Sequence, residues 1–350
     1  MKTVYVGMSG GVDSSVSAAL LKQQGYSVVG VYMKNWTQDV AGVACPWRQD
    51  LADARAAAAK LDIPFKVFDF QAEYRAHVVD VMVAEYAAGR TPNPDVLCNQ
   101  EIKFNLFFKA AMADGADAIA TGHYAGTKDG QLLRAHDAAK DQTYFLYRVS
   151  GVALAKTLFP LAGLTKPEVR ELAEGFGLPT AKKPDSQGIC FVGEVGLKQF
   201  LRQYLDAQPG PVVDVTGRTV GTHEGAMFYT HGQRHGLGIG GGEPYYVTHK
   251  DIATNTVFVT TNPTDPDLAA RHVTIEQIHW IGAEPAPGKT YQARLRHRGE
   301  LIPATINPTV DGTVQITLDY PERAVTPGQS VVIYNGDVVL GGGIVRSAAA

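Results

Sequence analysis

Ser9-Gly10-Gly11-Val12-Asp13-Ser14-Ser15 is the stretch that decides how this sequence folds. It joins an apolar, β-branched run at residues 3–8 to a helix-like run at residues 17–23. A glycine-rich turn between a strand and a helix gathers backbone N–H groups at the positive end of a helix dipole. The stretch therefore predicts an anion-binding loop. It lacks the Walker pattern, whose lysine contacts the β and γ phosphates of a nucleotide.

Strands and helices alternate along the first 125 residues. We predict strands near residues 3–8, 26–33, 64–69 and 116–121, and helices near 14–24, 50–61, 73–88 and 99–113. This alternation indicates an α/β fold with a doubly wound parallel sheet. Such sheets bind ligands at the carboxyl ends of their strands, so we expect residues 7–15, 33–35 and 121–124 to line one pocket.

The sequence changes character after Pro209-Gly210-Pro211. Short β-rich runs follow, separated by glycine, proline and Asn-Gly turns. Asn335-Gly336 between two apolar runs is a strong β-hairpin signal. We predict three units: a catalytic domain over residues 1–206, a small central domain over 207–274 and a C-terminal β-barrel over 275–350.

One glycine pattern in the second half of the chain matches a dinucleotide-binding motif but lacks the structural context of that motif. Residues 236–241 match the dinucleotide-binding pattern G-x-G-x-x-G literally. That pattern requires a following helix, but here Glu243-Pro244 and a strand-like run at 245–248 follow. We therefore expect a turn or loop at this place and no dinucleotide site.

Composition and charge narrow the classes of protein. The chain has 350 residues, of which 45% are hydrophobic and 19% charged, as is usual for a globular protein in water. No apolar run reaches the ~18 residues that a membrane helix needs, so we expect a cytoplasmic protein without membrane contact. The net charge of −3 gives no general argument for RNA binding. An RNA substrate would need a local basic patch, for which residues 182–183 and 294–298 are available.

Two of the three cysteines lie in loops that favour reactive thiols. Cys98 follows a proline-rich loop and precedes the helix predicted near residue 99, where a thiol pKa is lowered, and Asp95 is close enough to exchange a proton with the same site. Cys190 lies in a loop with lysines nearby, which also favours the thiolate. Taken alone, each thiol also fits an unreactive buried position, as we expect for Cys45. The three are too few and too scattered for a disulfide framework or a zinc site, so we expect no tightly bound metal.

An anion loop and two reactive thiols together indicate a specific chemistry. ATP can activate a carbonyl oxygen by adenylation, a cysteine persulfide can then deliver sulfur, and a second thiol can release it by forming a disulfide. The loop at residues 9–15 resembles that of the N-type ATP pyrophosphatases, which split ATP into AMP and pyrophosphate. Nearly the whole chain is similar to the bacterial tRNA-specific 2-thiouridylases, which replace O2 of the wobble uridine with sulfur. The matching motifs are residues 9–15, 89–95, 97–99, 101–104, 120–124, 140–146, 185–191, 236–241 and 326–329.

The resemblance implies a role for each matched position. The ATP-binding residues would be Gly7, Met8, Ser9, Gly10, Gly11, Val12, Asp13, Ser14, Met33 and Gly122. The residues that meet the tRNA or its target base would be Asn93, Pro94, Asp95, His123, Lys140, Asp141, Gln142, Arg296, His297 and Gln329. Asp95 would transfer a proton, Cys190 would carry the persulfide, and Cys98 would be the nucleophile that ends the cycle as a Cys98–Cys190 disulfide.

The resemblance also implies the partners: ATP with Mg²⁺, a tRNA, and a protein that donates persulfide sulfur, either a sulfur relay or a cysteine desulfurase. For the RNA we expect Arg294, Arg296 and Arg298 to alternate along a strand and project from one face.

Two other functions compete with this one. Another ATP pyrophosphatase, such as an amide-forming synthetase, would use the same loop but leave the Cys98 and Cys190 motifs idle. An RNA-binding module that uses ATP only structurally would leave both thiols unexplained.

Overall fold

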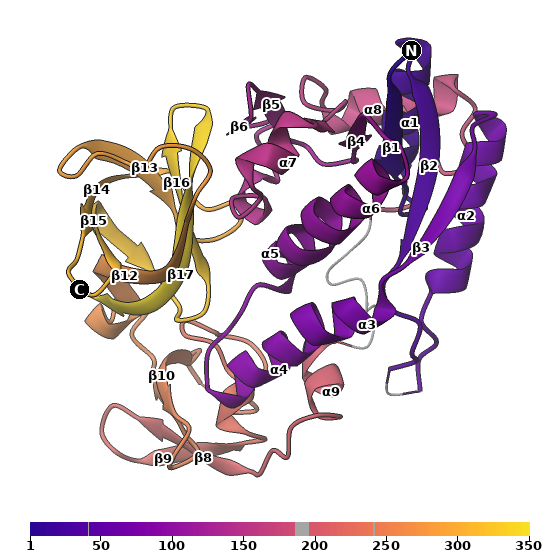
Figure 1. Ribbon diagram of the computed structural model, residues 1–350. Coiled ribbons are helices and arrows are strands. Elements are labelled where there is room, and N and C mark those ends of the chain that lie inside the picture. The colour runs from indigo at the N-terminus through magenta and orange to yellow at the C-terminus, as the bar shows by residue number, and fades with distance from the viewer. Residues whose placement is uncertain (41, 186–195, 241) are drawn as a thin grey trace.

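The structure is a computed structural model that describes residues 1–40, 42–185, 196–240 and 242–350 (Figure 1). Within them a parallel sheet has the strand order β3-β2-β1-β4-β7. Its strands are β1 Thr3–Gly7, β2 Ser27–Lys34, β3 Phe65–Asp69, β4 Ala118–Ala120 and β7 Thr157–Leu158. Because β1 pairs with β2 on one side and with β4 on the other, the strand order reverses at β1. Ligands bind such sheets at the carboxyl end of the strands where the order reverses, which here is the anion loop.

Helices cover both faces of this sheet (Figure 1). The α-helices of the described residues are α1 Val12–Gln23, α2 Trp47–Lys60, α3 Gln71–Tyr74, α4 Asp80–Ala87, α5 Pro94–Leu97, α6 Phe108–Ala113, α7 Gly151–Ala155, α8 Lys166–Gly175 and α9 Leu197–Leu201. Two π-helical segments, η1 Arg75–Val79 and η2 Cys98–Phe107, join α3 to α4 and α5 to α6. In β1, Val4 and Val6 pack in the cluster that holds α1 and α2, whereas Tyr5 packs with η2 on the other face. The predicted doubly wound fold is confirmed. None of the helices described is long and apolar enough to span a membrane.

The central domain is a small β-sheet. Its strands are β8 Gly210–Asp214, β9 Thr219–His223, β10 Tyr246–Asp251 and β11 Thr256–Thr260, in the order β10-β11-β8-β9. The core of the sheet is formed by Val212, Val247, Val257 and Val259. Gly236–Gly240 form bends and loop rather than the start of a helix, as the sequence predicts.

The C-terminal domain is a closed antiparallel barrel. Its strands are β12 Ala269–Trp280, β13 Thr290–Arg294, β14 Ile302–Pro308, β15 Val314–Arg323, β16 Ser330–Asn335 and β17 Val338–Ala349. The sheet runs β12-β15-β14-β13-β16-β17, and β12 pairs with β17 to close it. β16 and β17 form the hairpin predicted at Asn335-Gly336, where Gly336 has φ +60°.

A hairpin of the catalytic domain adds to this barrel sheet. β5 Gly126–Lys128 pairs with β6 Gln131–Leu133, and β6 in turn pairs with β17. The attachment is continued by the Arg134 N–H, which donates to the Asp337 carbonyl at 2.9 Å. The barrel and the catalytic domain therefore share one hydrogen-bonded sheet.

A buried ion pair lies in the same interface. The Arg294 guanidinium donates to Asp141 at 3.3 Å, and the two side chains are 8% and 1% exposed. Asp141 also accepts from the Ala135 N–H at 2.8 Å and from the Thr143 hydroxyl at 2.6 Å. These hydrogen bonds satisfy a carboxylate that is otherwise costly to bury.

The expectation that Arg294, Arg296 and Arg298 project from one strand face is wrong. β13 ends at Arg294, and the chain then turns, with Arg298 at φ +60°. Arg294 is buried against Asp141, while Arg296 and Arg298 are exposed. The alternating sequence was misleading because a strand period applies only while the strand continues.

The domain boundary predicted at residues 274 and 275 falls inside one strand. β12 runs without a break from Ala269 to Trp280 and pairs with β15 and β17 of the barrel. We therefore propose that the barrel domain begins at Ala269 and that the connection from the central domain covers residues 261–268.

The buried pair leads to a prediction about stability. Arg294→Ala leaves the Asp141 charge buried without its cation, so we expect the free energy of unfolding to fall by about 3–5 kcal/mol. Urea unfolding followed by tryptophan fluorescence measures this, and Lys289→Ala, at an exposed position of the same domain, is the control with a change within ~0.5 kcal/mol. Unchanged unfolding together with weakened RNA binding would instead assign Arg294 to the RNA.

Candidate active site

The glycine-rich turn predicted to bind an anion lies between β1 and α1. Gly10 has φ +79°, and a Cβ on it would lie 2.3 Å from the Asp50 carbonyl oxygen, so only glycine fits. Gly11 is the N-cap of α1 and, having no side chain, leaves the N–H groups of the first helical turn available to a ligand. The Ser15 hydroxyl donates to the Gly11 carbonyl at 2.8 Å and holds the turn. The turn thus has the backbone geometry that the sequence predicts for an anion-binding loop.

The ends of two further strands close around this loop, as expected from the sequence. A Cβ on Gly122, just after β4, would lie 2.6 Å from the Ser14 backbone nitrogen. A Cβ on Gly7 would lie 3.0 Å from the terminal methyl of Met33, at the end of β2. The next residue but one, Asn35, has a buried side-chain oxygen without a hydrogen-bond partner. These contacts bring the three predicted segments to one edge of the sheet.

A cluster of charged side chains extends from the loop. Lys166 Nζ bonds to Asp13 of the loop at 2.6 Å and to Asp185 at 2.9 Å. Asp185 also pairs with Lys140 at 2.7 Å and with Arg170 at 2.6 Å. Burial alone would raise the pKa of Asp185, but hydrogen bonds from Lys140 and Lys166 outweigh burial and hold this pKa well below its usual range. A carboxylate that stays ionised thus ties three cations together beside the loop.

The helix that carries Cys98 begins earlier than predicted. Asn93 caps it, because its side-chain oxygen accepts from the backbone N–H groups of Asp95 at 3.2 Å and Val96 at 3.4 Å, and Pro94 occupies the first turn. The predicted start near residue 99 is therefore wrong, and Cys98 lies one turn inside the helix. Asp95 and Cys98 are three residues apart and share one helix face. Cys98 is buried at 5% exposure, and burial raises the pKa of Asp95.

His123 joins this helix to the sheet edge. Burial lowers its pKa well below 6.5, and the Lys103 ammonium lowers it further, so the ring is neutral. Lys103 Nζ lies 3.4 Å from His123 Nε2, and Thr121 Oγ1 lies 2.8 Å from Nδ1. An ammonium can only donate, so Nε2 accepts and Nδ1–H donates to Thr121. Burial raises the pKa of Asp95, and the charge of the same ammonium partly offsets this rise, so Lys103 acts electrostatically on both groups.

Comparison with known proteins decides the family. Family models match three consecutive segments: a tRNA methyl transferase HUP domain over residues 2–194, a tRNA methyl transferase PRC-barrel domain over 198–261, and an aminomethyltransferase beta-barrel domain over 270–345. The tRNA-specific 2-thiouridylase MnmA of Thiobacillus denitrificans is 52% identical, covering 98% of this chain and 99% of its own length. Those of Proteus mirabilis and Escherichia coli O157:H7 are 49% and 50% identical, each covering 99% of this chain and 97% of its own length.

The chain belongs to the tRNA-specific 2-thiouridylase family. The resemblance seen in the sequence motifs is thus confirmed, and so is the architecture of a parallel-sheet domain, a small central domain and a β-barrel.

Three positions that the family resemblance assigns to tRNA contact are engaged within the protein. Lys140 pairs with Asp185, and Asp141 is buried against Arg294. Gln142 accepts the Tyr124 N–H through its side chain at 2.9 Å, and its own N–H donates to the Tyr124 carbonyl at 3.0 Å. In this structure the side chains of all three hold the fold around the site.

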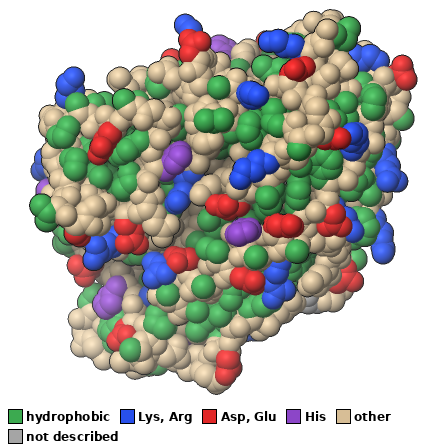
Figure 2. Space-filling view, viewed as in Figure 1, with side chains coloured by type: hydrophobic (Ala, Val, Ile, Leu, Met, Phe, Trp, Pro, Cys, Tyr) green, Lys and Arg blue, Asp and Glu red, His purple; other side chains and the backbone are tan. Residues whose placement is uncertain are grey.

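The three barrel positions that the resemblance assigns to RNA contact differ in their partners within the protein. Arg296 is exposed and pairs with Glu322 at 2.7 Å, and the His297 ring lies 4.5 Å from the Phe145 ring, centroid to centroid. Gln329 donates to the Thr91 carbonyl at 2.8 Å. On the face shown in Figure 2, basic and acidic side chains are interspersed and form no broad basic patch.

Of the other two cysteines, only Cys45 lies among the described residues. Cys190 lies outside the described residues, so its expected role stays a prediction. Cys45 is half-buried near Trp36, and burial raises the pKa of its thiol. A raised pKa disfavours the thiolate, as expected for an unreactive cysteine. In the described parts of the chain, no group of His, Cys, Asp and Glu side chains is placed to hold a metal ion.

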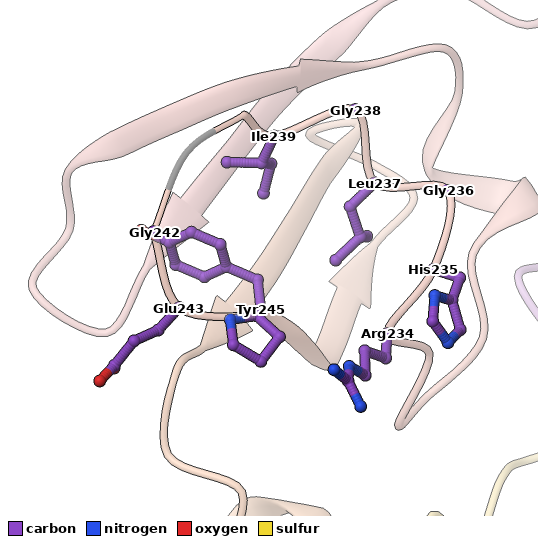
Figure 3. Close-up of a pocket in the computed structure, with 10 residues that line it drawn as sticks. Arg234, His235, Gly236, Leu237, Gly238, Ile239, Gly242, Glu243 and Tyr245 are labelled. Carbon is purple, nitrogen blue, oxygen red and sulfur yellow. The ribbon is translucent and has the colours of Figure 1, made fainter.

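A separate pocket lies in the central domain (Figure 3). It has a volume of about 230 Å³. Its lining includes Arg234, His235 and Glu243, together with residues 236–239 of the central domain. It contains none of the residues predicted to bind ATP or the target base.

Sequence reasoning missed Lys103 and Lys166. Lys103 lies in the matching motif at residues 101–104, and Lys166 lies in the first turn of the capped helix α8. Their partners His123 and Asp13 are distant in sequence, and the ion pair between Asp13 and Lys166 spans 153 residues. Only the fold brings these groups together.

Lys103 leads to a prediction about pH dependence. Lys103→Met removes the charge that lowers the pKa values of both Asp95 and His123, so both pKa values should rise. If the reaction needs the Asp95 carboxylate, the acid limb of the single-turnover rate profile should move to higher pH.

Two matched variants control this measurement. Lys103→Arg keeps the positive charge and should keep the wild-type profile, and Lys109→Met removes an exposed charge of α6 and should do the same. An acid limb that stays in place or moves to lower pH in Lys103→Met would contradict the assignment.

Proposed function

We propose that this chain catalyses the ATP-dependent 2-thiolation of the wobble uridine of tRNA. The uridine O2 attacks the α phosphorus of ATP, and pyrophosphate leaves. The outer sulfur of a cysteine persulfide then attacks C2, and AMP leaves with the former O2. The product is 2-thiouridine, with ATP and its Mg²⁺ as substrate and a persulfide-bearing protein as the sulfur source.

One observation carries the proposal. Gly122 and His123 join two parts of the site. One part is the anion loop, which lacks a Walker lysine, and the other is the helix face with Asp95 and Cys98. Gly122 packs on the loop, and His123 contacts Lys103 of that helix. A nucleotide phosphate and a base that reaches Asp95 would therefore meet at one edge of the sheet.

The protein residues have distinct tasks in this scheme. The first-turn N–H groups of α1 hold the phosphates, and Lys166 supplies a positive charge beside Asp13. Asp95, whose pKa is raised by burial, accepts the N3 proton of the uracil and thereby makes O2 a better nucleophile.

The thiols close the cycle. Once the persulfide sulfur is bonded to C2, the Cys98 thiolate attacks the carrier sulfur of Cys190. This step forms the Cys98–Cys190 disulfide and releases the thiolated base, because the C2–S bond keeps the electron pair of the broken S–S bond. An external thiol must reduce the disulfide before the next turnover.

Competing functions leave parts of this site without a task. An amide-forming synthetase would need the ATP loop but neither thiol. A methyl transferase, the term in two of the matched model descriptions, would need a methyl donor rather than a triphosphate, and the loop at the N-terminus of α1 would be idle. An RNA-binding module would need no proton-transfer group.

The first test concerns the nucleotide. Because the loop lacks a Walker lysine, we expect cleavage between the α and β phosphates, with one AMP and one pyrophosphate formed for each thiolated uridine. Thin-layer chromatography of α-labelled ATP, with and without unmodified tRNA and sulfide, measures this. Stoichiometric ADP would contradict the proposal.

The second test concerns the thiols. Cys98→Ser and Cys190→Ser should each reduce persulfide-dependent thiolation at least ~100-fold, because each removes the sulfur atom of one covalent step. ATP affinity should stay unchanged, since neither thiol belongs to the anion loop. Cys45→Ser is the matched control and should keep full activity.

Free sulfide separates the two thiol roles. Sulfide can replace a persulfide carrier but not a group that acts on the RNA, so it should rescue Cys190→Ser in part. Wild-type thiolation by Cys190→Ser with a protein persulfide donor would rule out the carrier role.

A further inference from the structure

Residues 89–92, the junction segment, lie where all three domains meet. A Cβ on Gly89 would lie 2.6 Å from the Ile252 side chain of the central domain. The Thr91 hydroxyl lies 3.2 Å from the Thr230 hydroxyl, also of the central domain. The Thr91 N–H donates to the Pro327 carbonyl of the barrel at 2.9 Å. One short stretch of the catalytic domain is thus attached to both of the other domains.

Gln329 holds the same segment from the barrel side. Its side-chain nitrogen donates to the carbonyl of Thr91 at 2.8 Å and lies 3.5 Å from that of Pro92. The preceding residue, Gly328, has φ +93°, and a Cβ there would lie 2.7 Å from the Thr91 nitrogen. The turn is itself fixed to β17, since the Gly328 N–H donates to the Val345 carbonyl at 2.9 Å. The close approach therefore requires glycine and a rigid barrel edge.

The junction segment leads directly into the catalytic helix. Pro92 and Pro94 restrict the backbone on both sides of Asn93, and the Asn93 side chain caps the helix that presents Asp95 and Cys98. Little freedom remains between Thr91 and Asp95. A shift of Thr91 is therefore passed on to the position of the Asp95 carboxylate.

We propose that Gln329 and Thr91 are positioning residues for the sulfur-transfer reaction: the barrel and the central domain hold the junction segment, and this hold sets the place of Asp95 and Cys98 relative to the target base. The inference rests on the proposed function. It assigns Gln329 a task in the rate of the reaction, in contrast to the contact with tRNA that the sequence resemblance implies.

The two roles for Gln329 differ in a measurable way. A positioning residue changes the rate at saturating substrates, because a small misplacement of reacting groups costs about 10–100-fold. A tRNA contact changes the dissociation constant of the tRNA instead. Thiolation and pyrophosphate release are therefore followed in single turnovers at saturating tRNA and ATP, and tRNA binding is measured separately by filter binding.

The variants remove one attachment at a time. Gln329→Leu keeps the size of the side chain and loses the donor, and Thr91→Val keeps the branched shape and loses the hydroxyl. Gln315→Leu, at an exposed position of the same barrel, and Thr91→Ser, which keeps the hydroxyl, are the controls. We expect a fall of about 10-fold or more in the saturated rate for both test variants, with tRNA dissociation constants within twofold of wild type and controls at the wild-type rate.

Other outcomes overturn the inference. A raised tRNA dissociation constant with an unchanged saturated rate would make Gln329 an RNA contact only. Wild-type values for both quantities in both variants would leave the junction without influence on catalysis. A wild-type protein that forms no thiouridine would refute the proposed function itself, so the two failures are distinguishable.

Gly328→Ala provides an independent check. Its methyl group would enter the space of Thr91, so the junction segment must move although no polar contact with RNA is removed. We expect the same fall in rate with unchanged tRNA binding. If this variant unfolds at a lower temperature than wild type, the comparison of Gln329→Leu with Gln315→Leu decides the question.

Discussion

The buried pair of Asp141 and Arg294 is the interaction on which the arrangement of the site depends. A buried ion pair adds little stability by itself, because the loss of hydration offsets the attraction between the charges. Here it fixes the stretch from Lys140 to Tyr144, from which several side chains reach different parts of the molecule. Lys140 reaches Asp185, Gln142 holds the backbone of Tyr124, and Tyr144 donates to the Ser330 carbonyl at 2.9 Å. The Tyr124 hydroxyl in turn donates to Asp13 of the anion loop at 3.1 Å, so hydrogen bonds together with the backbone from Asp141 to Gln142 link the barrel to that loop.

The local parts of this structure could be predicted from the sequence. The strand, loop and helix around residues 9–15, the Asn335-Gly336 hairpin and the capping box that begins α8 at Thr165 all follow from short-range patterns. The end of strand β13 at Arg294 could not be predicted, because the alternation of arginines in the sequence continues to Arg298. The cap at Asn93 is likewise not predicted, because prolines on both sides of a residue fit a loop as well as a helix start.

The parts of the site that the sequence did not reveal depend on distant partners. Lys166 lies 153 residues from Asp13, and Gln329 lies 238 residues from Thr91. A lone lysine or glutamine has no local signal for such a contact, since its side chain serves equally well on a solvated surface. The family resemblance named Gln142 and Gln329 as positions of interest, but it could not tell a contact with RNA from a contact that holds the site. The structure adds that both side chains form hydrogen bonds with backbone groups, Gln142 with Tyr124 and Gln329 with Thr91.

The anion loop and the helix of Asp95 and Cys98 are thus both linked to the barrel, at two neighbouring strands. The anion loop is tied through Tyr124, Gln142 and Asp141 to Arg294 on β13, and the helix of Asp95 and Cys98 is tied through Thr91 to Gln329, which immediately precedes β16. β13 and β16 pair directly, with Arg294 opposite Val332. Adenylation requires the attacking oxygen and the α phosphorus to approach within about 3–3.5 Å in line with the leaving group. The edge of the parallel sheet joins the loop and the helix through Gly122 and His123, and the barrel adds a second link to each of them. In the proposed reaction the task of the barrel is therefore to fix this distance, even where none of its side chains touches the reacting atoms.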